Sequence, residues 1–217
     1  MSRLVRPLLL GLLLLPAAEV PAQSPVVTVE TSTAARRKIR LAREYLGRDD
    51  WANAISLLRR TLADHPDDLV EIAPGRYLET TSLVNRLLVG MPPAGLAIYR
   101  DRVDPRARRW FESGRAKHDP VAVSRVLVEA YASRWADDAL WWLGEQSWQA
   151  NQPRRAARYW QQLLPRSATP AANAATLARG DLARIGQLGF PDSRHPEAQV
   201  RARLVLCHCL AGQLDRA

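Results

Sequence analysis

Apolar residues recur at intervals of three and four along most of this chain, and no stretch of useful length alternates between apolar and polar positions. The first spacing is typical of amphipathic helices, whereas alternation would indicate half-buried strands. Several expected helices begin at a proline, whose missing N–H costs no hydrogen bond there. The pattern predicts an all-α fold, with helices at Thr33–Leu46, Asp50–Asp64, Thr81–Val89, Pro93–Arg102, Pro105–Lys117, Pro120–Arg134, Ala136–Ala150, Pro153–Leu164, Ala172–Leu188, Pro196–Leu210 and from Gln213 onward.

One stretch departs from this helical pattern. Asp67–Glu79 carries no helical period, and its VEIAPGRYLE sequence places Pro74-Gly75 between two short apolar runs. Proline and glycine are the residues that turns favour. We therefore expect a short extended pair around Pro74-Gly75.

The N-terminus, MSRLVRPLLLGLLLLPAAEVPAQS, has the pattern of a secretory signal peptide. A short basic start precedes an apolar run at Leu8–Leu15, and small residues offer a cleavage site after Ala22. We expect residues 1–22 to be the signal peptide and 23–32 a linker. The apolar run is well short of the ~20 residues that span a bilayer, and an uncleaved anchor is the alternative. The mature chain would be exported to the periplasm or cell envelope, with membrane contact only through an uncleaved signal.

Three segments share an arrangement of helix, turn and second helix, with a small residue early in the second helix. The residues at these positions are Gly47, Trp51, Ala54, Leu58 and Pro66 in the first segment, Leu143-Gly144, Ala156 and Trp160 in the second, and Leu204, Gly212, Leu214 and Ala217 in the third. The arrangement resembles the tetratricopeptide repeat of about 34 residues. It implies a tetratricopeptide-like helical-hairpin solenoid over 33–217, irregular in the middle, with repeat-like units at 33–66, 136–165 and 197–217.

The third unit stops within its second helix, at Ala217. A repeat array normally ends in a capping helix with a polar outer face. We expect the chain to be truncated at its C-terminus, a fragment of a longer protein. The alternative is that residues 212–217 are a tail after a terminal helix.

A second resemblance covers nearly the whole mature chain, from Ala34 to Ala217. The residues that carry it are Leu87-Leu88, Pro92-Pro93, Gly95-Leu96, Tyr99-Arg100, Asp104-Pro105, Asp119-Pro120, Tyr131, Ala139-Leu140, Ala156 and Trp160–Leu164. This pattern resembles the N-terminal helical-repeat region of exported bacterial proteins that continue into a PQQ-like β-propeller. The resemblance implies an accessory helical domain whose ligand-binding or catalytic part lies outside this chain.

The formal net charge is +9, and Lys38 and Lys117 are the only lysines. The arginines are scattered, several of them in pairs: Arg36-Arg37, Arg59-Arg60, Arg108-Arg109 and Arg154-Arg155. This bias is either an effect of genome composition or the mark of an anionic partner, because arginine binds carboxylate and phosphate through two hydrogen bonds. With no dense basic tail and no recognised nucleic-acid motif, no nucleic-acid partner is expected.

Candidate chemistry is sparse. Cys207-His208-Cys209 lacks the spacing and the second ligand pair of a zinc site, and two cysteines at i and i+2 on a helix point to different faces. His118-Asp119 and Asp137-Asp138 precede expected helices, where an aspartate caps free N–H groups. No phosphate loop, nucleophile elbow or zinc-protease motif occurs. We expect no enzyme activity, no cofactor and no metal.

A stripe of large side chains on the expected helix 136–150 is the candidate partner-binding groove. Trp141, Glu145 and Trp148 lie at i, i+4 and i+7 on one face, and Asp138 and Gln149 flank it. In a tetratricopeptide array this face lines the concave groove, where tryptophan anchors a bound peptide. The alternative is that the tryptophans pack on adjacent helices. The sequence thus predicts a non-enzymatic interaction scaffold whose partner is a protein, a peptide or a C-terminal β-propeller of the full-length protein.

Overall fold

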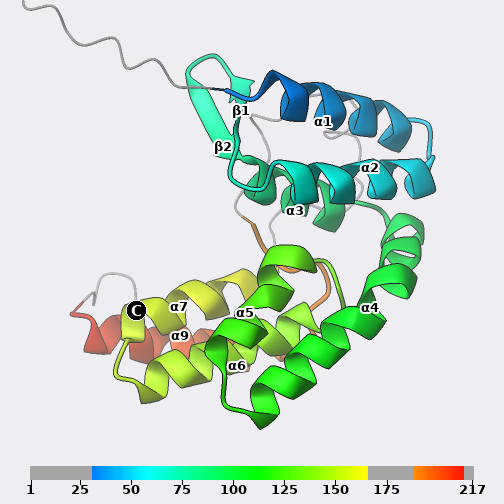
Figure 1. Ribbon diagram of the computed structural model, residues 1–217. Coiled ribbons are helices and arrows are strands. Elements are labelled where there is room, and N and C mark those ends of the chain that lie inside the picture. Colours follow the sequence, from blue (N-terminus) through cyan, green and yellow to red (C-terminus); the bar gives the residue numbers. More distant parts are fainter. Residues whose placement is uncertain (1–30, 166–187, 213–217) are drawn as a thin grey trace, which may run out of the picture.

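A computed structural model describes residues 31–165 and 188–212. Within these ranges the chain is mainly helical with one small hairpin (Figure 1), which confirms the expected helical class. The helices are α1 Thr33–Leu46, α2 Trp51–Asp64, α3 Thr80–Val89, α4 Pro93–Ala116, α5 Pro120–Glu129, α6 Ala136–Gln149, α7 Pro153–Trp160 and α9 Glu197–Leu210, with the 3-10 turn η1 at Gln161–Leu163. None of these helices is long and apolar enough to cross a membrane.

Some expected elements lie outside the described residues. These are the signal peptide at 1–22, the linker at 23–32 apart from its last two residues, the helix at Ala172–Leu188 apart from Leu188 itself, and the chain from Gln213 onward.

The described elements form two lobes joined by the long helix α4 (Figure 1). The first lobe contains α1, α2, the hairpin and α3. The second lobe contains α5, α6, α7, η1, α9 and the segment 188–196. Helices that follow each other along the chain pack together in pairs, α1 with α2, α4 with α5 and α6 with α7, while α9 packs on α7. Short connections thus bring sequence neighbours into contact throughout the described chain.

The hairpin consists of the antiparallel strands β1, Leu69–Ala73, and β2, Arg76–Glu79. Gly75 has a φ of 69°, a left-handed conformation that glycine adopts without steric cost. Pro74 supplies the fixed φ that suits the preceding turn position. The expected extended pair around Pro74-Gly75 is confirmed.

The core of the first lobe is aliphatic. Helix α1 begins at Ser32, whose hydroxyl oxygen accepts a hydrogen bond from the Ala35 backbone N–H at 3.2 Å, and Asp50 caps α2 in the same way through the Asn53 N–H at 3.2 Å. Each helix buries one apolar stripe, as its spacing predicts. The buried residues of the two stripes and of α3 include Ala35, Ile39, Ala42, Ala54, Ile55, Leu58, Leu83, Val84 and Leu87.

Residues Pro93–Ala116 form one continuous helix, α4, where the sequence predicts two, Pro93–Arg102 and Pro105–Lys117. That prediction is wrong because Pro105 lies inside α4 rather than at a helix start. An internal proline removes a hydrogen bond and costs about 3 kcal/mol. Burial on both sides of the proline offsets this cost. The buried side chains that recur every four residues along α4 are Tyr99, Val103, Ala107 and Phe111.

Helix α5 ends at Glu129, earlier than the predicted end at Arg134. The residues that follow, 130–133, form a buried turn. Arg100 of α4 donates its Nε–H to the carbonyl oxygen of Ala132 at 3.1 Å. This bond holds the turn in place after Ala130, which has left the helical conformation with φ −144° and ψ 35°.

The contact between α6 and α7 depends on Gly144. Trp160 of α7 is fully buried, and a Cβ atom at Gly144 would lie 2.5 Å from its Cε2 and 2.7 Å from its Cδ1. Only glycine lets the indole lie flat against α6. The Leu143-Gly144 pair and Trp160 thus meet in space, as their positions in the sequence pattern suggest.

Candidate functional site

The predicted groove residues of α6 face other parts of the same chain. Trp141 stacks on the imidazole of His195, with ring centroids 4.8 Å apart and an interplanar angle of 12°. Its indole also lies 5.9 Å from that of Trp160, and the Arg203 guanidinium lies 5.9 Å from its centroid. These partners come from the segment 188–196, α7 and α9.

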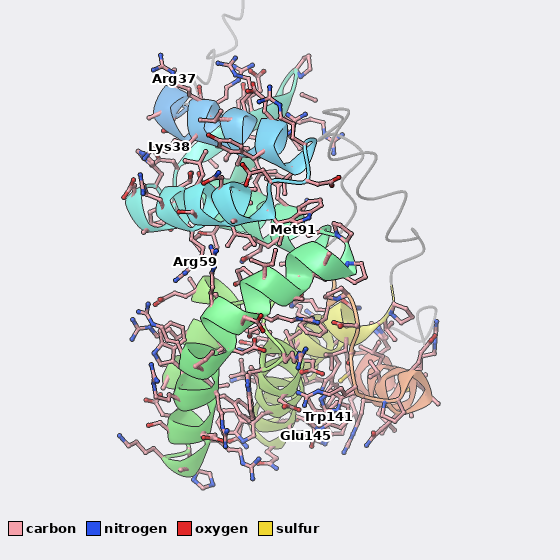
Figure 2. The ribbon with its side chains drawn as sticks, turned by 90° about the vertical axis from the view of Figure 1, so that its right-hand side faces the viewer. Arg37, Lys38, Arg59, Met91, Trp141 and Glu145 are labelled. Carbon is pink, nitrogen blue, oxygen red and sulfur yellow. The ribbon has the colours of Figure 1, made fainter. Side chains whose placement is uncertain are left out.

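Further along α6 from Trp141 lies Glu145 (Figure 2). It forms an ion pair with Arg203 of α9, with 3.1 Å between Oε1 and Nη2. Trp148 lies 6.3 Å from Trp160, centroid to centroid. Gln149 is exposed at the end of the helix. For Trp141 and Trp148 the structure has the packing on adjacent helices that we stated as the alternative. Contact of these residues with a partner stays a prediction.

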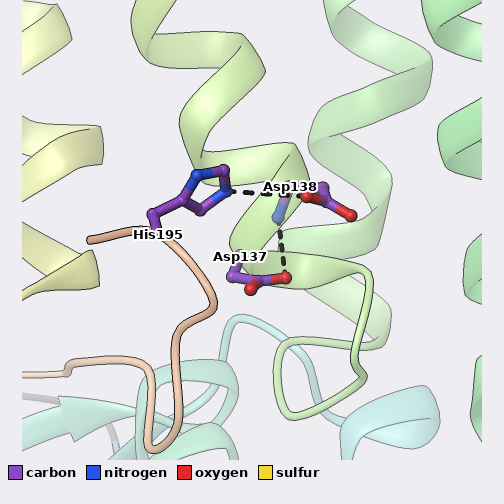
Figure 3. Close-up of side chains that lie close together, drawn as sticks. All are labelled: Asp137, Asp138 and His195. Atoms are coloured by element: carbon purple, nitrogen blue, oxygen red, sulfur yellow. Dashed lines mark hydrogen bonds and ion pairs between the residues drawn. The ribbon is translucent and has the colours of Figure 1, made fainter. Parts of the chain in front are cut away.

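The first turn of α6 binds the segment 188–196 through a buried carboxylate (Figure 3). The Asp137 side chain is 0% exposed and accepts hydrogen bonds from the Arg194 backbone N–H at 3.0 Å and from Arg194 Nη2 at 2.9 Å. Arg194 Nη2 also lies 2.6 Å from an oxygen of Asp138. His195 Nε2 approaches Asp138 Oδ1 to 3.5 Å. These contacts of Arg194 and His195 with Asp137 and Asp138 thus hold the segment on α6.

These contacts change the acidity of two groups. Burial raises the pKa of Asp138, but the hydrogen bond with His195 and the charge of Arg194 outweigh it and hold that pKa below its ordinary value. Hydrogen bonding to Asp137 raises the pKa of the Arg194 guanidinium above its ordinary value, against the effect of burial. The Arg194 guanidinium and the Asp138 carboxylate are therefore charged at neutral pH.

Asp137, Asp138 and His195 are also the group among residues 31–165 and 188–212 whose ligand atoms lie close enough to hold a metal ion, within 4.8 Å of one another. Arg194 Nη2, however, donates to both carboxylates, and its positive charge offsets one of their two negative charges. The cluster therefore serves as an anchor for the chain itself.

Our interpretation of Asp119 and of the Asp137-Asp138 pair as helix caps needs one correction. Asp119 caps α5, accepting from the Val121 and Ala122 N–H groups at 2.9 and 3.1 Å. Asp137 and Asp138 lie inside the first turn of α6, where their charge suits the helix dipole, but α6 has no side-chain cap bond at its N-cap residue. Their partners are Arg194 and His195 instead.

A second anchor joins the segment 188–196 to α4. Arg100 Nη1 and Nη2 donate to the two oxygens of Asp192 at 2.7 and 2.6 Å. Phe190 is buried and its ring centroid lies 6.0 Å from the Arg100 guanidinium carbon. Burial lowers the pKa of Arg100, but Asp192 raises it more, so its pKa stays above the ordinary value. One arginine thus connects α4, the turn after α5 and the segment 188–196.

An open pocket lies between α7 and the end of α9, with a volume of about 790 Å³. One wall consists of Arg154, Arg155 and Arg158, which are exposed. The opposite side includes Leu210 and Ala211. We call this site the arginine pocket. No acidic residue of the described chain lines it.

Beside the arginine pocket, the outer face of α9 carries unpaired apolar side chains. Leu210 is 65% exposed and Leu206 is 48% exposed; the two lie one turn apart. Val205 is also exposed. Large exposed apolar side chains scattered singly are ordinary, but a contiguous strip indicates a contact surface.

Only some of these features have a local signal in the sequence. The Arg154-Arg155 pair is visible as a pair, whereas Arg194, His195 and Arg203 carry no local signal because their partners lie on distant segments. Helical spacing identified the α6 stripe but not the segment that covers it. A basic helix with no nearby acidic residue is the signal that points to the arginine pocket.

Neither a family model nor a curated protein matches this chain, and no solved structure matches it either.

Proposed function

We propose that this chain is a non-enzymatic protein–protein interaction scaffold of the cell envelope, built from tetratricopeptide-like helical pairs. The observation that carries the proposal is the open surface of α7 and α9. There, three arginines that have no ion pair among the described residues line a pocket with exposed Leu210, and exposed Leu206 lies one turn behind Leu210. Each unit in a helical array buries its apolar face on a neighbour. A face that stays open in such an array is available to a partner.

The packing of the helical pairs supports this proposal. Ala54 and Ala156, at the small positions of the first two repeat-like units, are fully buried, as close contact between paired helices requires. Gly144 performs the same role opposite Trp160. The placement in the cell envelope depends on the signal-peptide pattern of residues 1–22.

The state of the charged cluster at α6 supports a binding rather than a catalytic role. General acid–base catalysis needs a group free to exchange a proton with a substrate. Asp137 and Asp138 are instead engaged by Arg194.

The second candidate is an accessory helical domain of a larger PQQ-like β-propeller protein. The exposed apolar face of α9, with Val205, Leu206 and Leu210, favours it, because a permanent interface within one polypeptide is more apolar than a transient one. Under this candidate the occupant of the face would belong to the same polypeptide.

Site-specific photo-crosslinking in the native cell tests both candidates. The photoreactive residue benzoylphenylalanine replaces Leu206, and the control replaces Val121 of α5, which is 78% exposed on another surface. We expect a discrete protein adduct from position 206 alone, lost when Leu210→Asp is added. An adduct with a separate polypeptide supports the scaffold, and a crosslink within one longer polypeptide supports the accessory domain. Absence of any adduct from position 206 contradicts both.

A further inference from the structure

We infer that the arginine pocket binds an acidic segment of a partner protein that also carries an apolar side chain. This inference depends on the proposed interaction function and adds the chemistry of the partner. Arg154, Arg155 and Arg158 would bind its carboxylates, and Leu210 would contact its apolar residue.

The three arginines of α7 lack the glutamate that some other exposed arginines of the described chain have one turn away on the same helix. Arg108 pairs with Glu112 at 2.8 Å, Arg125 with Glu129, and Arg201 with Glu197 at 2.6 Å. Helix α7, with the sequence PRRAARYW, contains no acidic residue. Within the described ranges, none of its three arginines forms an ion pair, and Arg155 has only a long 3.4 Å hydrogen bond to Gln152.

The position of these charges on α7 is electrostatically unfavourable without a ligand. Arg154 and Arg155 lie in the first turn, where the helix dipole is positive and an acidic residue would be favoured. Arg154 and Arg158 are four residues apart, a spacing at which like charges repel. A bound carboxylate is attracted both by the positive end of the helix dipole and by the arginines, so these two unfavourable interactions become favourable ones with the ligand.

A second basic surface shows why charge alone does not define the site. Helix α1 lines a pocket of about 580 Å³ with Arg36, Arg37, Lys38 and Arg40; Figure 2 labels Arg37 and Lys38 on this helix. Here the chain supplies counter-charges, because Arg36 lies 3.6 Å from Glu71 and Lys38 lies 2.6 Å from Asp64. The α1 pocket also has no large apolar wall. It therefore provides a control of similar charge.

The composition of the two walls favours a peptide over other anions. A guanidinium fork matches a carboxylate in geometry and binds it through paired hydrogen bonds. On the other side of the pocket Leu210, with Leu206 one turn behind it, gives the ligand an apolar contact that a phosphate backbone could not use. Gln152 and Gln162 add amide groups that can bond a peptide backbone.

Fluorescence anisotropy with a defined probe tests the inference. The probe is a fluorescein-labelled peptide of glutamate and leucine, and its matched control has glutamine in place of each glutamate. The test variant is the triple substitution Arg154→Gln, Arg155→Gln and Arg158→Gln. The control variant is Arg36→Gln, Arg37→Gln and Arg40→Gln, which removes the same charge. Circular dichroism verifies that both variants keep their helix content.

We expect the test variant to weaken binding about tenfold or more, as loss of charge-assisted hydrogen bonds predicts, and the control variant to weaken it less than about twofold. Leu210→Ser should weaken binding a few-fold, because it removes apolar contact area. The glutamine peptide should bind poorly to the unmodified chain.

Equal losses in the two triple variants would overturn the inference, since they would indicate attraction to net charge only. Tighter binding of single-stranded DNA or of vesicles containing anionic phospholipid, lost in the test variant, would also overturn it in favour of that ligand. A protein adduct at position 206 without peptide binding refutes the acidic segment and leaves the scaffold standing. Peptide binding without any adduct supports the pocket chemistry and contradicts the scaffold.

Discussion

The two lobes are held together by different kinds of contact. In the first lobe, aliphatic side chains of α1, α2 and α3 pack between elements that are close in sequence. In the second lobe, tryptophans and ion pairs join segments that are far apart, such as Arg194 to Asp137, 57 residues away, and Arg100 to Asp192, 92 residues away. The stability of the first lobe thus depends on apolar surface removed from water. The stability of the second lobe depends on the geometry of its ion pairs and tryptophan contacts.

This difference predicts how each lobe tolerates substitution. Aliphatic packing is non-directional and accepts small changes of volume at moderate cost. A buried ion pair requires one specific geometry, and so does an indole packed on a glycine. Loss of the first leaves a charge without a partner, and loss of the second displaces the ring. Matched substitutions in the two lobes therefore test the comparison.

The largest contrast is expected between two glycine-to-alanine substitutions. Gly144→Ala in the second lobe places a methyl group inside the indole of Trp160 and should lower the free energy of unfolding by about 3 kcal/mol. Gly47→Ala in the first lobe meets only helix carbonyls at 3.6 Å, at a φ of −70°. It should raise stability by about 0.5 kcal/mol, because the unfolded chain loses freedom. Urea denaturation measures both, and similar effects would contradict the comparison.

The next contrast is between two carboxylates. Asp137→Asn leaves Arg194 without its buried partner and should lower the free energy of unfolding by about 2 kcal/mol, the scale of a hydrogen bond to a charged group. Asp64→Asn removes the partner of Lys38 on the first lobe, where the side chain is 45% exposed and solvent screens the pair. Its effect should be clearly smaller in the same denaturation experiment. If Asp64→Asn lowered the free energy of unfolding as much as Asp137→Asn, burial of the carboxylate would not explain a difference between the lobes.

The smallest contrast is in the response to acid. The pKa of Asp138 is lowered in the folded chain, so its stabilisation is present above the unfolded value of about 3.9 and is lost as the pH falls through the folded pKa. The free energy of unfolding should fall below about pH 4 in the unmodified chain. With Asp138→Asn, part of that fall should vanish, on the order of 1 kcal/mol.

Asp68 of the first lobe is the control for this acid response. The hydrogen bond with the Ser32 side chain, helped by His65, also lowers its pKa, but this carboxylate is open to solvent. Asp68→Asn should therefore change the pH profile less than Asp138→Asn. The reverse order would be evidence against the anchoring role of the cluster at α6.

Much of the first lobe could be predicted from sequence because its signals are local. The observed bounds of α1, Thr33–Leu46, equal the predicted ones, since Ser32 caps one end and Gly47 follows the other. The hairpin at Pro74-Gly75 is equally local.

The errors fall where a distant residue overrides the local rule. Pro105 continues α4 because buried neighbours stabilise the helix on both sides. Helix α5 stops at Glu129, and the turn after it is held by a bond from Arg100 of the distant helix α4 to the carbonyl of Ala132. No sequence window of helical length contains both partners of such contacts.

In the candidate site, too, features with local signals could be predicted, whereas contacts with distant residues could not. The spacing of Trp141, Glu145 and Trp148 placed them on one side of α6, but their partners His195 and Arg203 depend on the path of the chain. The Arg154-Arg155 pair could be seen in the sequence, whereas Leu210 joins it only through the packing of α9 on α7. The sequence thus identifies the arginine wall of the pocket, but not the opposite wall that completes it.

The buried carboxylate of Asp137 has a consequence for the order in which the chain assembles during synthesis. While the ribosome has released only the residues up to α7, the first turn of α6 has its carboxylate but not the guanidinium of Arg194. A carboxylate without a counter-ion is costly to bury, and closing a long loop is slow compared with pairing neighbouring helices. The first lobe can therefore complete its packing early, while the α6 end of the second lobe stays hydrated until residue 194 emerges.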